Sequence, residues 1–387
     1  MDINIIEEFK RVFGYNENVR KFFSPGRVNL IGEHTDYNGG NVFPCALNFG
    51  TYGAVSLRKD TKCRMYSYNF KDKGIIKFDV NNIKFDKEHD WVNYCKGVIN
   101  VMDKHGFKIN NGFDLYVYGD IPNGAGLSSS ASLELLTAVI VNELYNLNID
   151  RISLVKYSQE AENKFVGVNC GIMDQFAIGM GKENNAILLD CQSLEYTYCN
   201  LNLQDCSIII SNTNKRRGLA DSKYNERRQE CEEALSILKE NLNISSLGDL
   251  SIEEYEMTKD ILKNDIIQRR AKHAVYENQR TLKAKEALSN NDLDLFGKLM
   301  IESHKSLKED YEVTGLELDT LVDLANNQEG TLGSRMTGAG FGGCTISLVK
   351  NENIDDFIKN VGEKYKNKIG YSASFYIAKT GNGTREI

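Results

Sequence analysis

The chain has 387 residues, of which 41% are hydrophobic and 26% are charged, and this ordinary globular composition excludes a largely disordered protein. Lys and Arg total 47 against 54 Asp and Glu, so the net charge of −7 provides no general attraction to nucleic acid or to an anionic membrane surface. At roughly 150 residues per domain, this length predicts two or three domains, with room for a cleft between two of them.

The cysteines and the N-terminus bear on where the protein works. The nine cysteines are scattered, odd in number and include no C-x-x-C pair, which argues against a disulfide framework or a zinc site. The opening MDINIIEEFKRVF lacks the basic start and unbroken apolar core of a signal peptide, and no run approaches the roughly 18 apolar residues of a membrane span. We therefore expect a cytoplasmic protein.

The first half of the chain begins with strands and continues with helices. Segments between residues 27 and 118, such as TYGAVSL, CRMYSY and FDLYVYG, are rich in β-branched and aromatic residues, which is typical of strands. Residues 128–146 are apolar on nearly every face and predict a buried helix, whereas residues 152–165 predict an amphipathic one. NNAILLDC then predicts a short buried strand.

The strand CSIIISN opens the second half, and we place a domain boundary before it, with an N-terminal domain at residues 1–203 and a C-terminal domain at 204–387. Residues 226–304 are helical and carry charges of alternating sign, which is typical of a solvated scaffold. GSRMT, CTISLV and SASFYIA predict strands, with a helix near 354–366. Strands and helices follow one another without a regular βαβ array, so the fold class is α+β.

The stretch GDIPNGAGLSSSASLELL has the design of an anion site. Gly124 and Gly126 let backbone N–H groups approach a phosphate closely, and the helix that follows offers unpaired N–H groups and the positive end of its dipole. A glycine–serine turn is also a plain way to start a helix, so both interpretations stay open for this segment alone.

Two common nucleotide-binding motifs are missing. No Gly-Lys is followed by Ser or Thr, and the H-R-D and D-F-G elements of protein kinases are absent, which excludes a Walker A site and a protein kinase. Gly338, Gly340 and Gly343 fit G-x-G-x-x-G, but the run leads into a β-branched strand and does not open a helix. A Rossmann dinucleotide site is therefore disfavoured.

Three motifs occur in a telling order: SPGRVNLIGEHTDYNGG at 24–40, IPNGAGLSSSAS at 121–132 and RMTGAGFGGC at 335–344. Together they resemble the GHMP small-molecule kinases, and the first is similar to the galactokinase signature within that family. CGIMDQF, SKYNERR and HKSLKEDYEVT also resemble galactokinase segments, so the resemblance spans most of the chain. It implies a two-domain GHMP kinase fold with the active site in the cleft between the domains. It also implies a kinase that uses Mg²⁺ and ATP as co-substrate and phosphorylates the anomeric hydroxyl of galactose.

The resemblance assigns catalytic and metal-associated roles. Arg27 matches the family's transition-state arginine, a permanent cation whose donors suit phosphate oxygens, and Asp174 matches the aspartate that accepts or orients the proton of the sugar hydroxyl. The sequence leaves open whether Asp174 is a true base or a positioning acceptor. Ser130 and Glu162 match the magnesium-associated residues, whose hard oxygen ligands suit that ion. Without the motifs, all four would more often be structural.

The remaining assignments concern the two substrates. The sugar-binding positions are Glu33, His34, Thr35, Asp36, Gly171 and Tyr224. The nucleotide-binding positions are Ser67, Gly124, Ala125, Gly126, Leu127, Ser128, Ser129 and Ser130. Trp91 either lines the adenine pocket or anchors the core. The third motif, around 338–343, is expected to bring its backbone close to the phosphate loop.

Two alternatives stay open. A sibling GHMP kinase acting on N-acetylgalactosamine or another small molecule would have much the same nucleotide site, although EHTDYNGG favours unmodified galactose. A non-catalytic regulator that senses ATP and galactose would keep the fold, yet the complete GLSSSAS segment argues against it. We expect small-molecule substrates, and neither nucleic acid nor a membrane nor an obligate protein partner.

Overall fold

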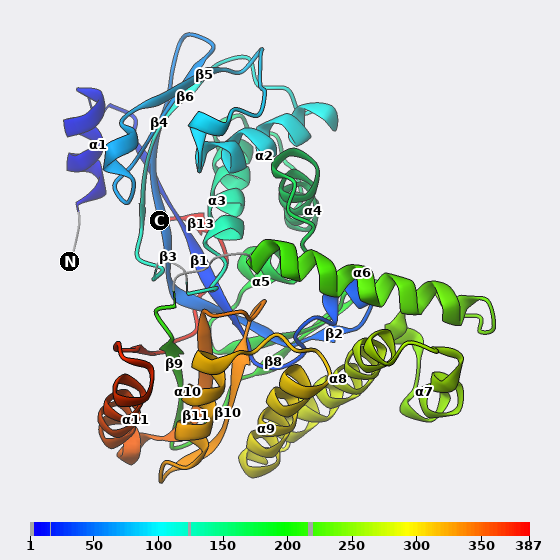
Figure 1. Ribbon diagram of the computed structural model, residues 1–387. Coiled ribbons are helices and arrows are strands. Elements are labelled where there is room, and N and C mark those ends of the chain that lie inside the picture. The colour runs from blue at the N-terminus through cyan, green and yellow to red at the C-terminus, as the bar shows by residue number, and fades with distance from the viewer. Residues whose placement is uncertain (1–3, 16, 123–124, 216–219) are drawn as a thin grey trace.

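The computed structural model describes residues 4–15, 17–122, 125–215 and 220–387 of the chain. In Figure 1 a mixed sheet and its helices form the upper part of the molecule, and a second sheet with its helices forms the lower part. This is the α+β fold that the sequence predicts, and the segments of the three motifs come together where the two parts meet.

The larger sheet has the strand order β13-β1-β3-β6-β4-β5, and its neighbours are antiparallel except for β4 and β6. Side chains alternate between its faces along each strand. Val55 and Leu115 therefore pack with helices α2 and α3, while Ala54 and Tyr116 on the other face pack with α1. The bounds are β1 (Arg20–Asn29), β3 (Pro44–Leu57), β4 (Lys62–Ser67), β5 (Ile76–Asp79), β6 (Phe113–Gly119), β13 (Arg385–Glu386), α1 (Ile5–Phe13), α2 (Val92–Lys104) and α3 (Ser129–Leu144).

The predicted buried helix is α3, and its burial on nearly every face follows from its position. It packs against β1 and β3 on one side and against α2, α4 (Arg151–Ala161) and α5 (Met173–Met180) on the others. The predicted amphipathic helix is α4, which passes into a π-helical turn at Glu162–Val166. A small sheet of β2 (Asn41–Val42), β7 (Asn185–Asp190) and β8 (Tyr196–Asn200) completes the first half.

The second sheet has the order β10-β11-β9-β12 and is antiparallel throughout. Ile209 and Val349 on one face pack with α10 and α11, whereas Ile208, Ile210 and Ile346 on the other face join a core cluster that also contains Phe43 of the first half. The bounds are β9 (Cys206–Asn212), β10 (Thr331–Thr337), β11 (Cys344–Lys350), β12 (Ser374–Ile377), α10 (Leu316–Asn326) and α11 (Ile354–Ile369).

The predicted helical region at residues 226–304 corresponds to α6 (Ala220–Lys239), α7 (Ile252–Thr258), α8 (Asp265–Ser289) and α9 (Leu293–Glu309). Among the described residues, no helix combines the length and the apolar character needed to cross a lipid bilayer. The chain then builds the rest of the second sheet and returns to the first, where β13 pairs with β1 (Figure 1). We retain a division near residue 203 as a proposal, since the second sheet begins at Cys206.

Candidate active site

Three cavities meet at the start of α3, and Ser129 and Ser130 line all of them. The first, of about 240 Å³, we call the apolar cavity because its wall includes the large hydrophobic side chains Phe70, Trp91, Tyr94, Val117, Ile121 and Leu133. The second, of about 310 Å³, is the polar cavity, since acids, a histidine and an arginine line it. A junction cavity of about 170 Å³ lies along residues 125–130 between them. The arrangement accommodates two ligands whose ends approach each other at the helix N-terminus.

Arg27 and Asp174 form a bidentate ion pair that lines the polar and junction cavities. Arg27 donates from Nε to Oδ1 of Asp174 at 2.8 Å and from Nη2 to Oδ2 at 3.0 Å, and its Nη1 donates to the Gly126 carbonyl at 2.7 Å. The Ser128 hydroxyl also donates to Asp174 Oδ2. Arg27 is 4% exposed and Asp174 27% exposed, so the arginine is fixed while the carboxylate still reaches the cavity.

The local backbone explains this geometry. The register between β1 and β3 shifts between Pro25 and Arg27, and such a bulge re-aims the side chain that follows it. A Cβ on Gly26 would lie 3.0 Å from the Leu127 carbonyl oxygen, so glycine allows β1 to approach the phosphate loop closely. The sequence Pro-Gly-Arg thus brings the guanidinium to the loop that opens α3.

The described part of the phosphate loop, residues 125–130, turns into α3 through left-handed residues. Gly126 has φ 72° and Ser128 has φ 62°, a conformation that glycine adopts freely and serine rarely. The third motif reaches this loop as expected, because a Cβ on Gly338 would lie 3.1 Å from the Gly126 carbonyl oxygen and 3.8 Å from Arg27 Nη2. Gly124 lies outside the described residues.

Glu162 and Ser130 come together at the wall of the polar cavity. Burial, followed by the charge of Asp174, raises the pKa of Glu162 to about 7. Behind it lies Glu134 of α3, which is fully buried, and burial together with the Glu162 charge raises its pKa well above the ordinary value. Gln175 donates from Nε2 to both carboxylates, at 2.6 Å to Glu162 and 3.0 Å to Glu134. Asp174, Glu162 and Glu134 therefore lie close enough together for the charge of one to disfavour ionisation of the next.

Glu33 lines the polar cavity, but its carboxylate is already engaged by the third motif. Arg335 donates to Oε2, and Oε1 accepts from the Thr337 hydroxyl at 3.2 Å and from the Gly338 amide at 3.0 Å. The Glu33–Arg335 pair is almost completely buried, with 1% and 0% exposure. Arg335 is the first residue of the third motif, but nothing in the motif marks it as the partner of Glu33, and it was not predicted as a site residue.

His34 also lines the polar cavity, in a left-handed conformation with φ 62°. Its Nδ1 lies 2.7 Å from the Tyr37 hydroxyl, while its buried Nε2 has no hydrogen-bond partner among the residues that the structure describes. Burial, with a further contribution from His273, lowers the pKa of His34 to about 3, so the imidazole is neutral. The Tyr224 ring lies 5.6 Å from the His34 ring between centroids.

Asp36 and Gly171 face each other at one wall of the polar cavity. A Cβ on Gly171 would lie only 1.9 Å from Asp36 Oδ2, so the contact requires glycine. Burial and the charge of Asp174 raise the pKa of Asp36 to about 6. Thr35, in contrast, turns away: its hydroxyl lies 2.8 Å from the Gly32 carbonyl oxygen and 2.7 Å from that of Asn41, where it holds the signature loop.

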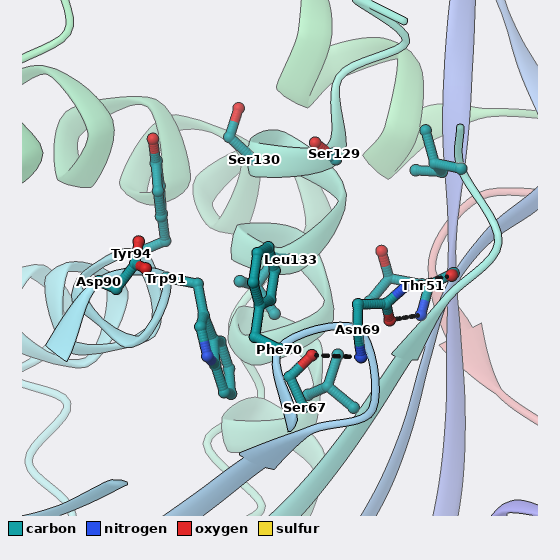
Figure 2. A pocket seen from close by; sticks show the side chains of 13 residues that line it. Thr51, Ser67, Asn69, Phe70, Asp90, Trp91, Tyr94, Ser129, Ser130 and Leu133 are labelled. Atoms are coloured by element: carbon teal, nitrogen blue, oxygen red, sulfur yellow. Dashed lines mark hydrogen bonds between the residues drawn. The ribbon is translucent and has the colours of Figure 1, made fainter. Parts of the chain in front are cut away.

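Ser67 and Trp91 line the apolar cavity, together with Ser129 and Ser130 of the phosphate loop (Figure 2). Trp91 is buried, and its Nε1 has no partner within the described part of the chain. The Ser67 hydroxyl accepts from the backbone N–H of Asn69 at 3.3 Å. The Asn69 side chain donates from Nδ2 to the Gly119 carbonyl at 2.8 Å and accepts at Oδ1 from the Gly119 N–H at 2.8 Å. Asn69 and its neighbour Phe70, which also line this cavity, were not predictable as site residues, because a loop asparagine and phenylalanine carry no distinctive spacing.

Family models match three parts of the chain: "Galactokinase galactose-binding signature" at residues 7–57, "GHMP kinases N terminal domain" at 93–182 and "GHMP kinases C terminal" at 284–367. The chain is 60% identical to the galactokinase of Clostridium acetobutylicum, with 100% of this chain and 99% of that protein covered. It is 55% identical to the galactokinase of Bacillus subtilis, with coverage of 98% and 97%.

Comparison with solved structures identifies the same family. The crystal structure of Lactococcus lactis galactokinase complexed with galactose superposes with a TM-score of 0.97 at 50% identity, over 99% of this chain and 98% of that one. A mevalonate kinase structure with a TM-score of 0.66 and 21% identity, over 94% and 99% of the two chains, shares the fold. The chain therefore belongs to the galactokinase family of the GHMP kinases and is an ATP-dependent sugar kinase.

Proposed function

We propose that this chain transfers the γ-phosphoryl group of ATP to the anomeric hydroxyl of galactose, giving galactose 1-phosphate and ADP. The observation that carries the proposal is the Arg27–Asp174 pair, which lies where the polar and junction cavities meet. A nucleotide in the apolar cavity would extend its phosphates along the phosphate loop toward a sugar in the polar cavity. The high identity to curated galactokinases across the whole chain supports galactose as that sugar.

The chemistry follows from what phosphoryl transfer requires. The transferred group passes through a loose transition state, so catalysis depends on alignment and on stabilising charge more than on covalent assistance. Asp174 presents a carboxylate held by three donors, which orients the acceptor hydroxyl and takes its proton late in the transfer. Arg27 is a permanent cation beside the phosphate loop and stabilises the charge on the transferred group.

The residues at the cavity wall fit a magnesium ion. Ser130 and Glu162 provide hard oxygen ligands, and the neighbouring carboxylates create a potential that a divalent cation would relieve. Within the described residues no group of three His, Cys, Asp or Glu side chains could hold a metal ion, which agrees with an ion held partly by nucleotide phosphates. When bound, the ion would supply positive charge that offsets the charge of the nucleotide phosphates. Glu162 and Ser130 would orient it.

Sugar recognition is proposed for the polar cavity. The orphaned Nε2 of neutral His34, the Asp36 carboxylate and the half-buried Tyr224 provide groups that pair with hydroxyls. A site of this kind rejects an epimer by leaving buried groups unpaired. Glu33 would contribute a remaining lone pair besides its clamp on the third motif, and Thr35 would act through the loop that it holds.

We also propose a cytoplasmic location and activity without an obligate protein partner. All nine cysteines are free thiols, and most of them are buried, as in proteins of a reducing compartment. Residues proposed to bind each of the two substrates line cavities of this chain.

The test is product analysis with ATP, Mg²⁺ and a panel of acceptors that includes galactose, glucose and N-acetylgalactosamine. We expect galactose 1-phosphate as the main product, with losses of about 10²- to 10⁴-fold in kcat for Asp174→Ala and at least about 10³-fold for Arg27→Ala. Arg20→Ala, which breaks an ion pair with Glu386 at the sheet edge, serves as the control and should retain full activity. A better acceptor than galactose, or near-normal turnover in Asp174→Ala, would contradict the proposal.

A further inference from the structure

Behind the polar cavity, Gln175 connects two buried acids that come from different helices. Its Nε2 donates to Glu162 Oε2 at 2.6 Å and to Glu134 Oε2 at 3.0 Å. Gln175 and Glu134 have no exposed surface, and Glu162 is 6% exposed, so bulk water does not reach the pair of bonds. Gln175 directly follows Asp174 in α5. This short helix therefore carries both the proposed partner of the sugar hydroxyl, Asp174, and the residue that contacts Glu162.

The side chain of Glu162 is held separately from its backbone, whose carbonyl accepts from the Gly167 amide at 2.9 Å and from the Val168 amide at 3.1 Å. Glu162 is the first residue of the π-helical turn that follows α4, where the regular i→i+4 hydrogen bonding of the helix is interrupted. Its carboxylate is held by side chains: Oε2 accepts from Gln175 Nε2 at 2.6 Å and from the Cys170 thiol at 3.4 Å. Of these two donors, the Gln175 amide makes the shorter contact.

The arrangement costs stability, and this argues for a functional role. Glu134 Oε1 and Gln175 Oε1 are buried without partners in the described structure, and a buried polar atom without a hydrogen bond destabilises the folded state. The neighbours of Glu134 on α3 are leucines, so an apolar residue would fit the surrounding core. Residues that break the local pattern at such a cost are expected at functional sites.

We propose that Gln175 is a positioning residue that orients the Glu162 carboxylate toward the magnesium–nucleotide complex, and that Glu134 holds Gln175 in place. The inference rests on the proposed role of Glu162 in magnesium binding. Hydrogen bonds that orient a metal-associated group are commonly worth 10- to 100-fold in metal affinity, roughly the effect expected here. Binding of nucleotide without magnesium, and binding of galactose, do not involve this link.

The test measures ADP binding to the full chain by titration calorimetry, with and without Mg²⁺, for Gln175→Met and Glu134→Met. We expect the gain in ADP affinity that Mg²⁺ provides to fall about 10- to 100-fold in both variants, while magnesium-free ADP binding and galactose binding stay unchanged. Glu134→Gln keeps an oxygen that accepts from Gln175 and should restore most of the gain. Thr137→Val, which removes a buried hydrogen bond one turn further along α3, is the matched control.

The outcomes separate the inference from the proposal beneath it. If the unmodified chain gains no ADP affinity from Mg²⁺, the proposed magnesium role fails. If it gains affinity and a folded Gln175→Met retains the full gain, the positioning role is overturned. Should Gln175→Met not fold, Gln175→Asn keeps the amide but is one methylene too short to reach both carboxylates, and a full gain there would overturn the inference equally.

Discussion

Gly171→Ala tests whether the contact between Gly171 and Asp36 defines the sugar side of the active site. The added Cβ would lie 1.9 Å from Asp36 Oδ2, 2.3 Å from its Cγ and 3.0 Å from its Cβ. The shortest of these distances falls about 1.5 Å below the 3.4 Å at which ordinary van der Waals contact begins. Gly171 does not have a positive φ, so alanine brings no backbone strain and the clash is the whole perturbation.

The clash must move the Asp36 carboxylate or the loop that carries residue 171. A displacement of about 1 Å in a positioning group can cost on the order of 10²-fold, so kcat/KM for galactose should fall by about that factor. ADP affinity should stay unchanged, because the apolar cavity does not include either residue. Steady-state kinetics with varied galactose, together with calorimetric titration of ADP, measure the two effects.

Gly362→Ala is the control, since it lies in α11 and its Cβ would meet only the edge of the Phe375 ring, at 3.2 Å. It should leave both quantities unchanged. Normal kcat/KM for galactose in a folded Gly171→Ala variant would refute the role of the Asp36–Gly171 wall. Equal losses of galactose and ADP binding would indicate general misfolding instead of a local displacement.

Three further changes test other parts of the site. Arg335→Met leaves the Glu33 carboxylate buried without its cation and should lower the free energy of unfolding by about 3 to 5 kcal/mol in urea denaturation; a loss under about 1 kcal/mol would contradict the clamp. Because burial raises the Asp36 pKa from 3.8 to about 6, the native state keeps its proton to higher pH than the unfolded state does. The wild type should therefore lose up to about 2 kcal/mol of stability relative to Asp36→Asn as the pH rises from 4 to 6, and parallel pH profiles would refute this. Trp91→Ala should weaken ADP binding about tenfold with galactose binding unchanged; equal losses of both would identify Trp91 as a plain core anchor.

Much of the fold was predictable because the sequence pattern has a direct physical cause. Residues 129–144 are apolar all round, and the only place for such a helix is between a sheet and other helices, where α3 lies. The β-branched strands CSIIISN and CTISLV pair with each other as β9 and β11. The pairing of β13 with β1 was not predictable, because a strand of two residues is too short to show a periodic pattern of apolar residues.

The candidate site was predictable as a set of residues but not as a geometry. The motifs identify Arg27 and Asp174, yet 147 positions separate them, and the bidentate contact follows from the bulge in β1 and the start of α5. For Glu33, the sequence predicted a role but did not reveal the residue that holds its carboxylate. Its position in the signature predicted sugar binding, and its partner Arg335, 302 positions away, is visible only once the two halves pack together.

A single residue shows where physical reasoning about the sequence stops. Glu134 stands among leucines in a helix that the sequence already predicts to be buried, and a carboxyl without water must be paired or protonated. The sequence therefore states that Glu134 needs a partner, although it does not say which residue provides one. Gln175 lies 41 positions further on, in a short helix whose first turn also carries Asp174, and only the packing of α5 against α3 brings its amide within reach. An acid inside an apolar helix is thus evidence that a site exists, and the fold is needed to say what the site does.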